Sequence, residues 1–109
     1  MPTTYKVLGQ SAPAATTDTT LYTVPAATQT VVSTLVICNR STVSATYRVA
    51  IRVAGTTLVN KDYIAFDSPI PGSDTIALTL GLTLGATDVV TVRASTADVS
   101  FNIFGSEIS

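Results

Sequence analysis

Apolar and polar residues alternate in short runs along most of this chain, and this alternation predicts β-strands. The clearest run spans residues 46–53. Its apolar set, which we expect to face a core, is Tyr47, Val49, Ile51 and Val53. The intervening set, which we expect to face solvent, is Thr46, Arg48, Ala50 and Arg52. Because successive side chains of a strand point to opposite faces, this run predicts a half-buried strand.

Residues 29–38 are apolar in both alternating sets. One set contains Val31, Leu35 and Ile37, and the other contains Val32, Val36 and Cys38. We therefore expect a central strand, covered on one face by the opposite sheet and on the other by a loop or a neighbouring subunit. Cys38 is the single cysteine, so no intramolecular disulfide can form, and its position in this run predicts a buried, unreactive thiol.

The remaining pattern predicts further short strands separated by turns. These strands are expected at residues 4–8, 20–24, 63–66, 75–80, 90–94 and 99–104. The strongest loop signal is the run at 67–74, and a glycine bend or bulge is expected near Gly81. Together these runs predict an all-β, antiparallel β-sandwich of about eight strands. Both a jelly-roll and an immunoglobulin-like topology satisfy the spacing.

The length of the chain, 109 residues, suits one domain, and we place its β-sandwich at residues 18–109. Residues 1–17 are predicted to form an amino-terminal strand followed by an extended arm, because residues 10–17 are small and show no periodicity. Such an arm can add a strand to the exposed sheet edge of a neighbour. The alternative is a loosely packed terminus.

The amino-acid composition supports the prediction of β-strands and argues against several classes of binding partner. About one residue in five is threonine, whereas glutamate, lysine and glutamine are scarce. Charged residues make up 12% of the chain and the net charge is −1, so we expect neither nucleic acid nor an anionic membrane as a partner. No run approaches the ~20 apolar residues of a membrane span, and the amino terminus lacks a signal-peptide pattern. We therefore expect synthesis and folding in a cytoplasm.

The residues that commonly carry catalysis are missing or unpaired. The chain has no histidine, which removes the usual general base and the commonest metal ligand. Most aspartates fall in predicted loops or at strand starts, where a carboxylate caps a turn. Asp67 and Asp74 are alternative candidates for calcium, but the loop between them lacks the alternating aspartates of a calcium-binding loop. We expect no enzyme activity, no cofactor and no metal.

Three residues are candidates for binding a partner protein. Tyr5 lies on the first strand of the segment that we expect to reach a neighbour, and Arg48 and Arg52 share the outward face of one strand. The two arginines have two interpretations: they keep that face soluble and guard an edge, or they dock onto an acidic patch of a partner. The chain has no tryptophan, which disfavours a lectin.

Six segments carry a resemblance to a known group of proteins. They are TTLYTVPA at 19–26, VVSTLVICN at 31–39, YRVAIR at 47–52, TLGLTL at 79–84, ATDVV at 86–90 and FNIFGSEI at 101–108. Together they resemble small virion structural proteins of tailed bacteriophages, including cyanophages. The resemblance spans nearly the whole chain and concerns the strands rather than an active site.

This resemblance implies a β-sandwich on the outside of a virus particle, where its partners are other virion proteins. We expect a capsid cement or decoration protein that binds the major capsid protein and forms a homo-oligomer, for which a trimer is one closed symmetry. The alternative is a tail or neck fibre module with a host-receptor or carbohydrate-binding role. A third class is a carbohydrate-binding module of cellular origin.

Overall fold

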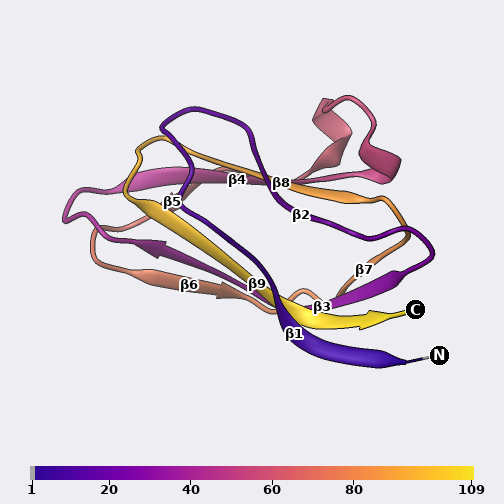
Figure 1. Ribbon diagram of the computed structural model, residues 1–109. Coiled ribbons are helices and arrows are strands. Elements are labelled where there is room, and N and C mark those ends of the chain that lie inside the picture. The colour runs from indigo at the N-terminus through magenta and orange to yellow at the C-terminus, as the bar shows by residue number, and fades with distance from the viewer. Residues whose placement is uncertain (1) are drawn as a thin grey trace.

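The structure, a computed structural model, describes residues 2–109 and consists of two antiparallel β-sheets packed face to face (Figure 1). Over these residues, nine strands build the sheets: β1 (Thr3–Ser11), β2 (Thr19–Thr23), β3 (Gln29–Asn39), β4 (Ala45–Arg52), β5 (Tyr63–Ile70), β6 (Thr75–Leu78), β7 (Leu82–Leu84), β8 (Val89–Ala94) and β9 (Val99–Ile108). Two short 3-10 turns, η1 (Val53–Gly55) and η2 (Asn60–Asp62), join β4 to β5. The predicted all-β sandwich is confirmed.

The strands pair as one long antiparallel hairpin that has been rolled up. β4 pairs with β5, β3 with both β6 and β7, β2 with β8, and β1 with β9. Rolling brings β9 beside β3 and β8 beside β4. Sheet A therefore has the order β1-β9-β3-β6, with β7 also paired to β3, and sheet B has the order β2-β8-β4-β5. This connectivity is a jelly roll, which decides between the two topologies that the sequence leaves open.

The glycine bend expected near Gly81 is present and divides one strand into two. Gly81 has a φ of 63°, a conformation that glycine adopts without steric cost. On either side of it, Leu78 pairs with Leu35 and Leu82 pairs with Val32. The chain thus bends outward between β6 and β7 while both halves stay paired with β3, and the strand count becomes nine.

The core consists of the inward side chains of both sheets. Seven of them, each at most 1% exposed, are Leu35, Ile37, Phe101 and Ile103 from sheet A and Val49, Val90 and Val92 from sheet B. The alternation predicted for β4 is confirmed at Tyr47 and Val49, which are buried. It is wrong at Val53, which is 59% exposed because the chain leaves the sheet there and enters η1. Ala50 faces outward as expected but is covered, at 1% exposure.

A β-bulge in β3 changes the face on which its first residues lie. The pairing of β3 with β9 shifts by one residue between Val32 and Thr34, so the residues on the two sides of the bulge alternate out of phase. Inward side chains are consequently Val32, Leu35 and Ile37, and outward ones are Val31, Val36 and Cys38. The predicted grouping of Val31 with Leu35 is wrong. The prediction of a buried thiol is also wrong, because Cys38 is half-buried on the outer side.

β5 is longer than the sequence pattern predicts. Residues 67–74 are expected to form a loop, but β5 continues to Ile70 and the turn begins at Pro71. Pro69 is compatible with β5 because this strand lies at an edge of sheet B, where a missing backbone N–H can face away from the ladder. The loop prediction is therefore wrong for the first half of the run and confirmed for residues 71–74.

A buried asparagine connects two turns at one end of the sandwich. Asn39 is 1% exposed, and its Nδ2 donates to the carbonyl oxygens of Val43 at 2.8 Å and of Ile70 and Pro71 at 3.3 Å each. Its Oδ1 accepts the backbone N–H of Ser41 at 3.0 Å. This side chain therefore holds the turn after β3 against the turn after β5.

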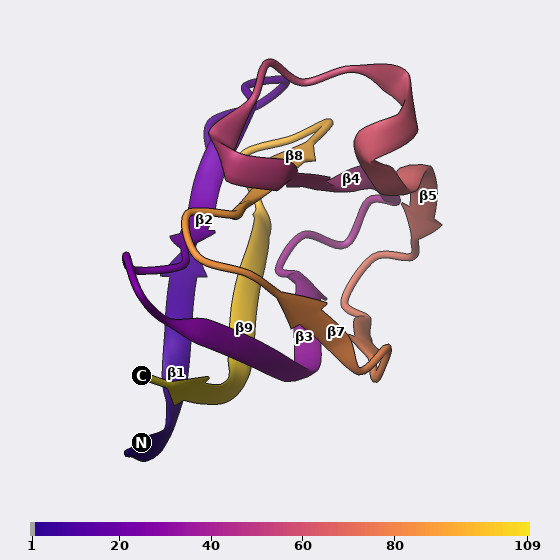
Figure 2. The same ribbon diagram turned by 90° about the vertical axis from the view of Figure 1, so that its right-hand side faces the viewer.

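The amino-terminal residues belong to sheet A. β1 pairs with β9 along its whole length, and residues 12–18 then cross to sheet B. The two termini lie side by side at one end of the molecule (Figure 2), where the backbone N–H of Ser109 donates to the Pro2 carbonyl at 3.1 Å. Met1 lies outside the described residues. A contact of residues 1–17 with a neighbour stays a prediction, for which β1 offers the outer edge of sheet A.

Gly105 lies where β9 passes close to β3. A Cβ atom on this residue would overlap the backbone carbonyl of Val31. We predict that Gly105→Ala lowers the free energy of unfolding by about 3 kcal/mol, because backbone atoms cannot move aside as a flexible side chain can. Denaturant unfolding followed by circular dichroism measures the loss.

Gly85→Ala is the matched control for this substitution. Its Cβ would meet Asp88 Oδ2, the nearest atom, at an ordinary contact distance of 3.7 Å. The free energy of unfolding should stay the same or rise by up to about 1 kcal/mol, because alanine restricts the unfolded chain more than glycine does. Equal stability of the two variants would contradict the close approach of β9 to β3.

Candidate interaction surfaces

The outer face of sheet A carries no charged side chain within residues 2–109. Residues paired across neighbouring strands share a face, so the register defines five outward rows. They are Thr3–Ile108–Gln29, Tyr5–Ser106–Val31–Thr83, Val7–Phe104–Thr34, Gln10–Asn102–Val36–Ala77 and Ser100–Cys38–Thr75. We call these rows the uncharged face. Lys6 points to the other side of β1, where its Nζ lies 2.9 Å from Glu107 Oε1.

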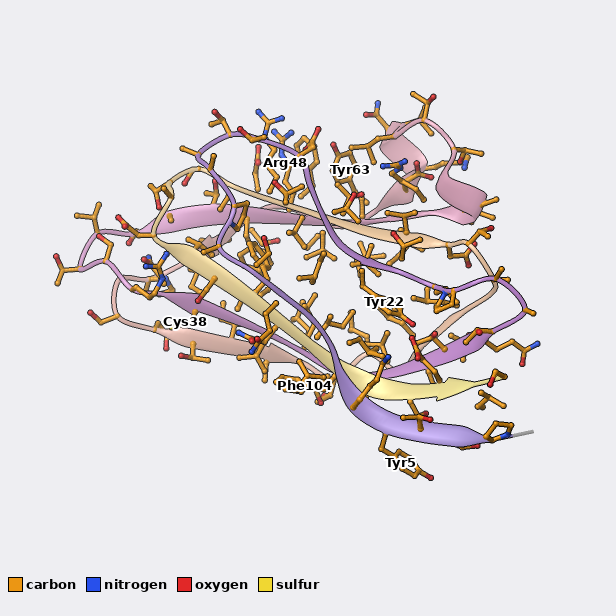
Figure 3. All side chains as sticks on the ribbon, in the orientation of Figure 1. Tyr5, Tyr22, Cys38, Arg48, Tyr63 and Phe104 are labelled. Atoms are coloured by element: carbon orange, nitrogen blue, oxygen red, sulfur yellow. The ribbon has the colours of Figure 1, made fainter. Side chains whose placement is uncertain are left out.

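Several apolar side chains of the uncharged face are open to solvent. Tyr5 is 83% exposed, Val7 49% and Val31 38%. Phe104 is half-buried, and together with Tyr5, Lys6 and Val31 it lines a shallow hollow of about 320 Å³. Figure 3 shows Tyr5 and Phe104 on the sheet A side of the molecule, opposite Arg48 and Tyr63. Three of the exposed large apolar side chains therefore share the uncharged face, while Ile64 and Phe66 are exposed on β5 of sheet B.

The outer face of sheet B is charged and is organised around Arg48. Its Nε donates to Asp67 Oδ1 at 2.7 Å and its second guanidinium nitrogen donates to Asp67 Oδ2 at 3.1 Å. The guanidinium also lies 4.0 Å from the centre of the Phe66 ring. These hydrogen bonds raise the pKa of Arg48 and lower the pKa of the Asp67 carboxyl. On the same sheet, Arg93 lies 3.7 Å from Asp18.

An aromatic hollow lies beside Arg48 on sheet B. It has a volume of about 440 Å³ and is lined by Asn60, Tyr63 and Phe66. The two rings meet edge to face, with centres 4.9 Å apart and an interplanar angle of 84°. Aromatic surface beside an amide is suited to a small ligand or to a side chain of a partner.

The aromatic hollow is not apparent from the sequence. Most tyrosines and phenylalanines are expected to face inward, yet Phe66 is 54% exposed. The reason is that the pairing of β4 with β5 shifts its register twice, so Tyr63 and Phe66 come to lie on the same outer side. The sequence around Phe66 shows no alternation that would reveal this arrangement.

The structure does not bring the three predicted partner-binding residues together. Tyr5 lies on the uncharged face of sheet A, whereas Arg48 and Arg52 lie on sheet B. Arg48 is bound to Asp67, and Arg52 donates to the carbonyls of Thr56 at 2.9 Å and Gly55 at 3.0 Å. An acidic patch of a partner would have to compete with these internal contacts for either arginine.

The interpretation of loop aspartates as turn caps is confirmed at three positions. Asp62, Asp74 and Asp88 accept backbone N–H groups of Val59, Thr75 and Gly85, respectively, at 2.9 to 3.0 Å. The two calcium candidates have separate internal partners, since Asp67 binds Arg48 while Asp74 caps its own turn. Within residues 2–109, no three side chains of histidine, cysteine, aspartate or glutamate come together in a metal-binding group.

A polar network joins the two sheets beneath the ends of β1 and β9. The hydroxyl of Tyr22 donates to Glu107 Oε2, and because a phenol has only one proton, the Thr30 hydroxyl donates to Tyr22, at 2.8 Å. Burial and then the hydrogen bond to Glu107 raise the pKa of Tyr22 to about 12. The hydrogen bonds from Tyr22 and Lys6 lower the pKa of Glu107.

Because of this network, we expect the free energy of unfolding to depend on pH in both the acidic and the alkaline range. Because the pKa of Tyr22 is raised, the protonated hydroxyl stabilises the folded protein. This contribution is complete at pH values below the ordinary tyrosine pKa of 10.0 and is lost as the pH rises through about 12. The lowered pKa of Glu107 means that its stabilisation is present above its ordinary value of 4.5 and is lost as the pH falls below it.

We predict that Tyr22→Phe removes the tyrosinate absorbance step near pH 12 and that Glu107→Gln reduces the loss of stability in acid. Ultraviolet titration measures the first effect, with circular dichroism confirming that the protein is still folded. Unfolding at several acidic pH values measures the second. A folded wild-type protein whose tyrosine titration is complete well below pH 12 would contradict the buried network.

None of the helical segments in residues 2–109 has the length and apolar character that crossing a membrane requires. In comparisons with known proteins, no protein family, no curated protein and no solved structure matches this chain.

Proposed function

We propose that this chain is a structural protein on the outside of a bacteriophage particle, and specifically a capsid cement or decoration protein. Its partners in this proposal are other virion proteins, above all the major capsid protein, and further copies of itself. The observation that carries the proposal is the uncharged face of sheet A, with Tyr5, Val7 and Val31 open to solvent. The resemblance of its strand segments to virion proteins of tailed phages supports the same function.

Charge distribution is the physical argument for a role in protein contacts. A freely diffusing protein of this size normally carries charge over its whole surface. Here only 12% of residues are charged, and on the outer faces of the sandwich the charges lie on sheet B. The centres of protein interfaces are depleted of charge and enriched in aromatic residues, as the uncharged face is. Jelly rolls occur in viral capsid proteins and in lectins, so the fold is compatible with the proposal without establishing it.

A cement protein acts by mass action. It binds a surface that exists on the assembled shell and not on free shell subunits, so every bound copy lowers the free energy of the assembled state. No catalytic group is needed for this role, and the work is done by burial of apolar surface and by shape.

We predict that particles assembled without this chain release their genome at a lower temperature than complete particles. Purified protein added back should restore the release temperature, because binding to the assembled shell is the source of the stabilisation. Fluorescence of a DNA-binding dye during heating measures release. Absence of the protein from washed particles, or identical release temperatures with and without it, would refute the proposal.

The aromatic hollow favours a second candidate, a tail or neck fibre module that binds a host receptor or carbohydrate. Asn60, Tyr63 and Phe66 offer ring surface and an amide, which are groups that bind sugars. Position on the particle separates the two candidates. A cement protein remains on tailless heads at a copy number comparable with that of the major capsid protein, whereas a fibre module is recovered with the tails.

For the fibre candidate, we predict retention of the purified protein on immobilised host polysaccharide. Phe66→Ala should abolish retention because it removes the most exposed ring of the hollow. Tyr5→Ala is the matched control, since it removes an exposed aromatic side chain from the opposite sheet and should leave retention unchanged. Equal elution of wild-type protein and Phe66→Ala would argue against a sugar site in the hollow.

A further inference from the structure

The chemistry of the uncharged face restricts what can cover it. Tyr5, Val7 and Val31 present exposed apolar surface, and the other outward side chains are apolar or carry hydroxyl, amide or thiol groups. Lys6 lines the hollow beside Tyr5, but its ammonium group is paired with Glu107 on the other side of β1. Such a patch on a small protein marks a contact with another molecule. If a partner surface carried charged groups, contact would remove these groups from water, and the uncharged face offers them no opposite charge. The cost of this desolvation disfavours such a partner.

Of the outer faces of the two sheets, the uncharged face fits best against the same face of a second copy. The outer face of sheet B carries Arg48 with Asp67 and Arg93 with Asp18, all partly exposed. A head-to-tail contact of sheet A on sheet B would desolvate these two ion pairs. A contact between two uncharged faces buries no charge on either side, and the hydroxyl and amide groups can bond to each other across it. A contact of one patch with its own copy is two-fold symmetric.

The size of the face is sufficient for such a contact. β9 has 10 residues, which at ~3.4 Å each gives a length of about 34 Å, and four strands spaced by ~4.8 Å give a width of about 19 Å. One face then covers about 650 Å², and two faces together cover about 1,300 Å². Stable, specific protein interfaces bury roughly 1,200–2,000 Å² in total. A full face-to-face contact thus reaches the lower end of this range.

We propose that the uncharged face of sheet A binds the same face of a second copy of this chain, forming a two-fold dimer. Tyr5, Val31 and Phe104 lie in the interface, and the sheets stack face to face across it. The dimer leaves sheet B and its aromatic hollow exposed on both outer sides. This inference assigns the face that carries the proposed function to a second copy of the chain, and it is testable without a phage particle.

Cys38 provides an internal reporter of this contact. It is the single cysteine of the chain, and it lies half-buried in the outermost row of the uncharged face. Dimer formation covers this row, so the rate at which a maleimide modifies Cys38 falls as the protein concentration rises. Sedimentation velocity measures the oligomeric state over the same range of concentrations.

Val31→Lys is the variant that tests the interface, and Ile64→Lys is its matched control. The two positions have similar exposures, 38% and 41%, but Ile64 lies on β5 at the edge of sheet B. Val31→Lys places an unpaired charge in the contact and should raise the dimer dissociation constant by about 100-fold or more. It should also make Cys38 react at the monomer rate, whereas Ile64→Lys should dimerise as the wild type does.

Tyr5→Lys is a second test that puts little strain on the fold, because Tyr5 is 83% exposed on an edge strand. It should weaken the dimer in the same direction, and circular dichroism with unfolding midpoints verifies that each variant is folded. A wild-type protein that stays monomeric at high micromolar concentration would overturn the proposal. A trimer would do so as well, because a two-fold contact cannot close three copies.

Experiments on the particle separate this inference from the proposed function. Protection of Cys38 only in assembled particles, with a monomer in solution, would assign the uncharged face to another virion protein and overturn the second-copy proposal. A dimer in solution that is absent from particles would support the pairing of copies and refute the cement function.

Discussion

The pairing of β3 with β9 is the constraint on which the rest of the structure depends. It holds the two central strands of sheet A together, and the bulge between Val32 and Thr34 sets which of their side chains enter the core. Gly105 makes this approach possible because it has no Cβ to meet the Val31 carbonyl. The same bulge turns Val31 outward, so one local irregularity directs Val32 into the core and Val31 to the uncharged face.

The two sheets divide the surface chemistry of the molecule between them. Sheet B collects ion pairs, the Arg48 and Phe66 contact and the aromatic hollow, whereas the outward side chains of sheet A are apolar, hydroxyl, amide or thiol. Such separation suits a protein that is covered on one side and meets solvent or ligand on the other. The hydrogen bond from Tyr22 to Glu107 ties the two sheets together at the end where both termini lie.

Much of the fold follows from local patterns that tertiary contacts do not override. Alternation in β4 and β9 indicates their inward faces, and Gly81 indicates the break between β6 and β7. Errors arose where register shifts intervene, as at Val31 in β3 and in the extension of β5 past Asp67. The error at Cys38 has another cause, because Cys38 alternates as expected but lies on the outer face of sheet A. A shift by one residue moves every following side chain to the other face, and alternation alone does not reveal where a strand is interrupted.

The sequence by itself determined the fold class, because threonine and valine at period two can bury a continuous apolar face only as paired strands. It also indicated aspartates as turn caps, since an aspartate side chain bonds to the backbone only a few residues away. The tertiary structure alone decided the jelly-roll order, the separation of Tyr5 from Arg48 and the assembly of Tyr63 with Phe66. These features depend on which strands become neighbours and in what register, and contacts between residues far apart in the chain are what set both.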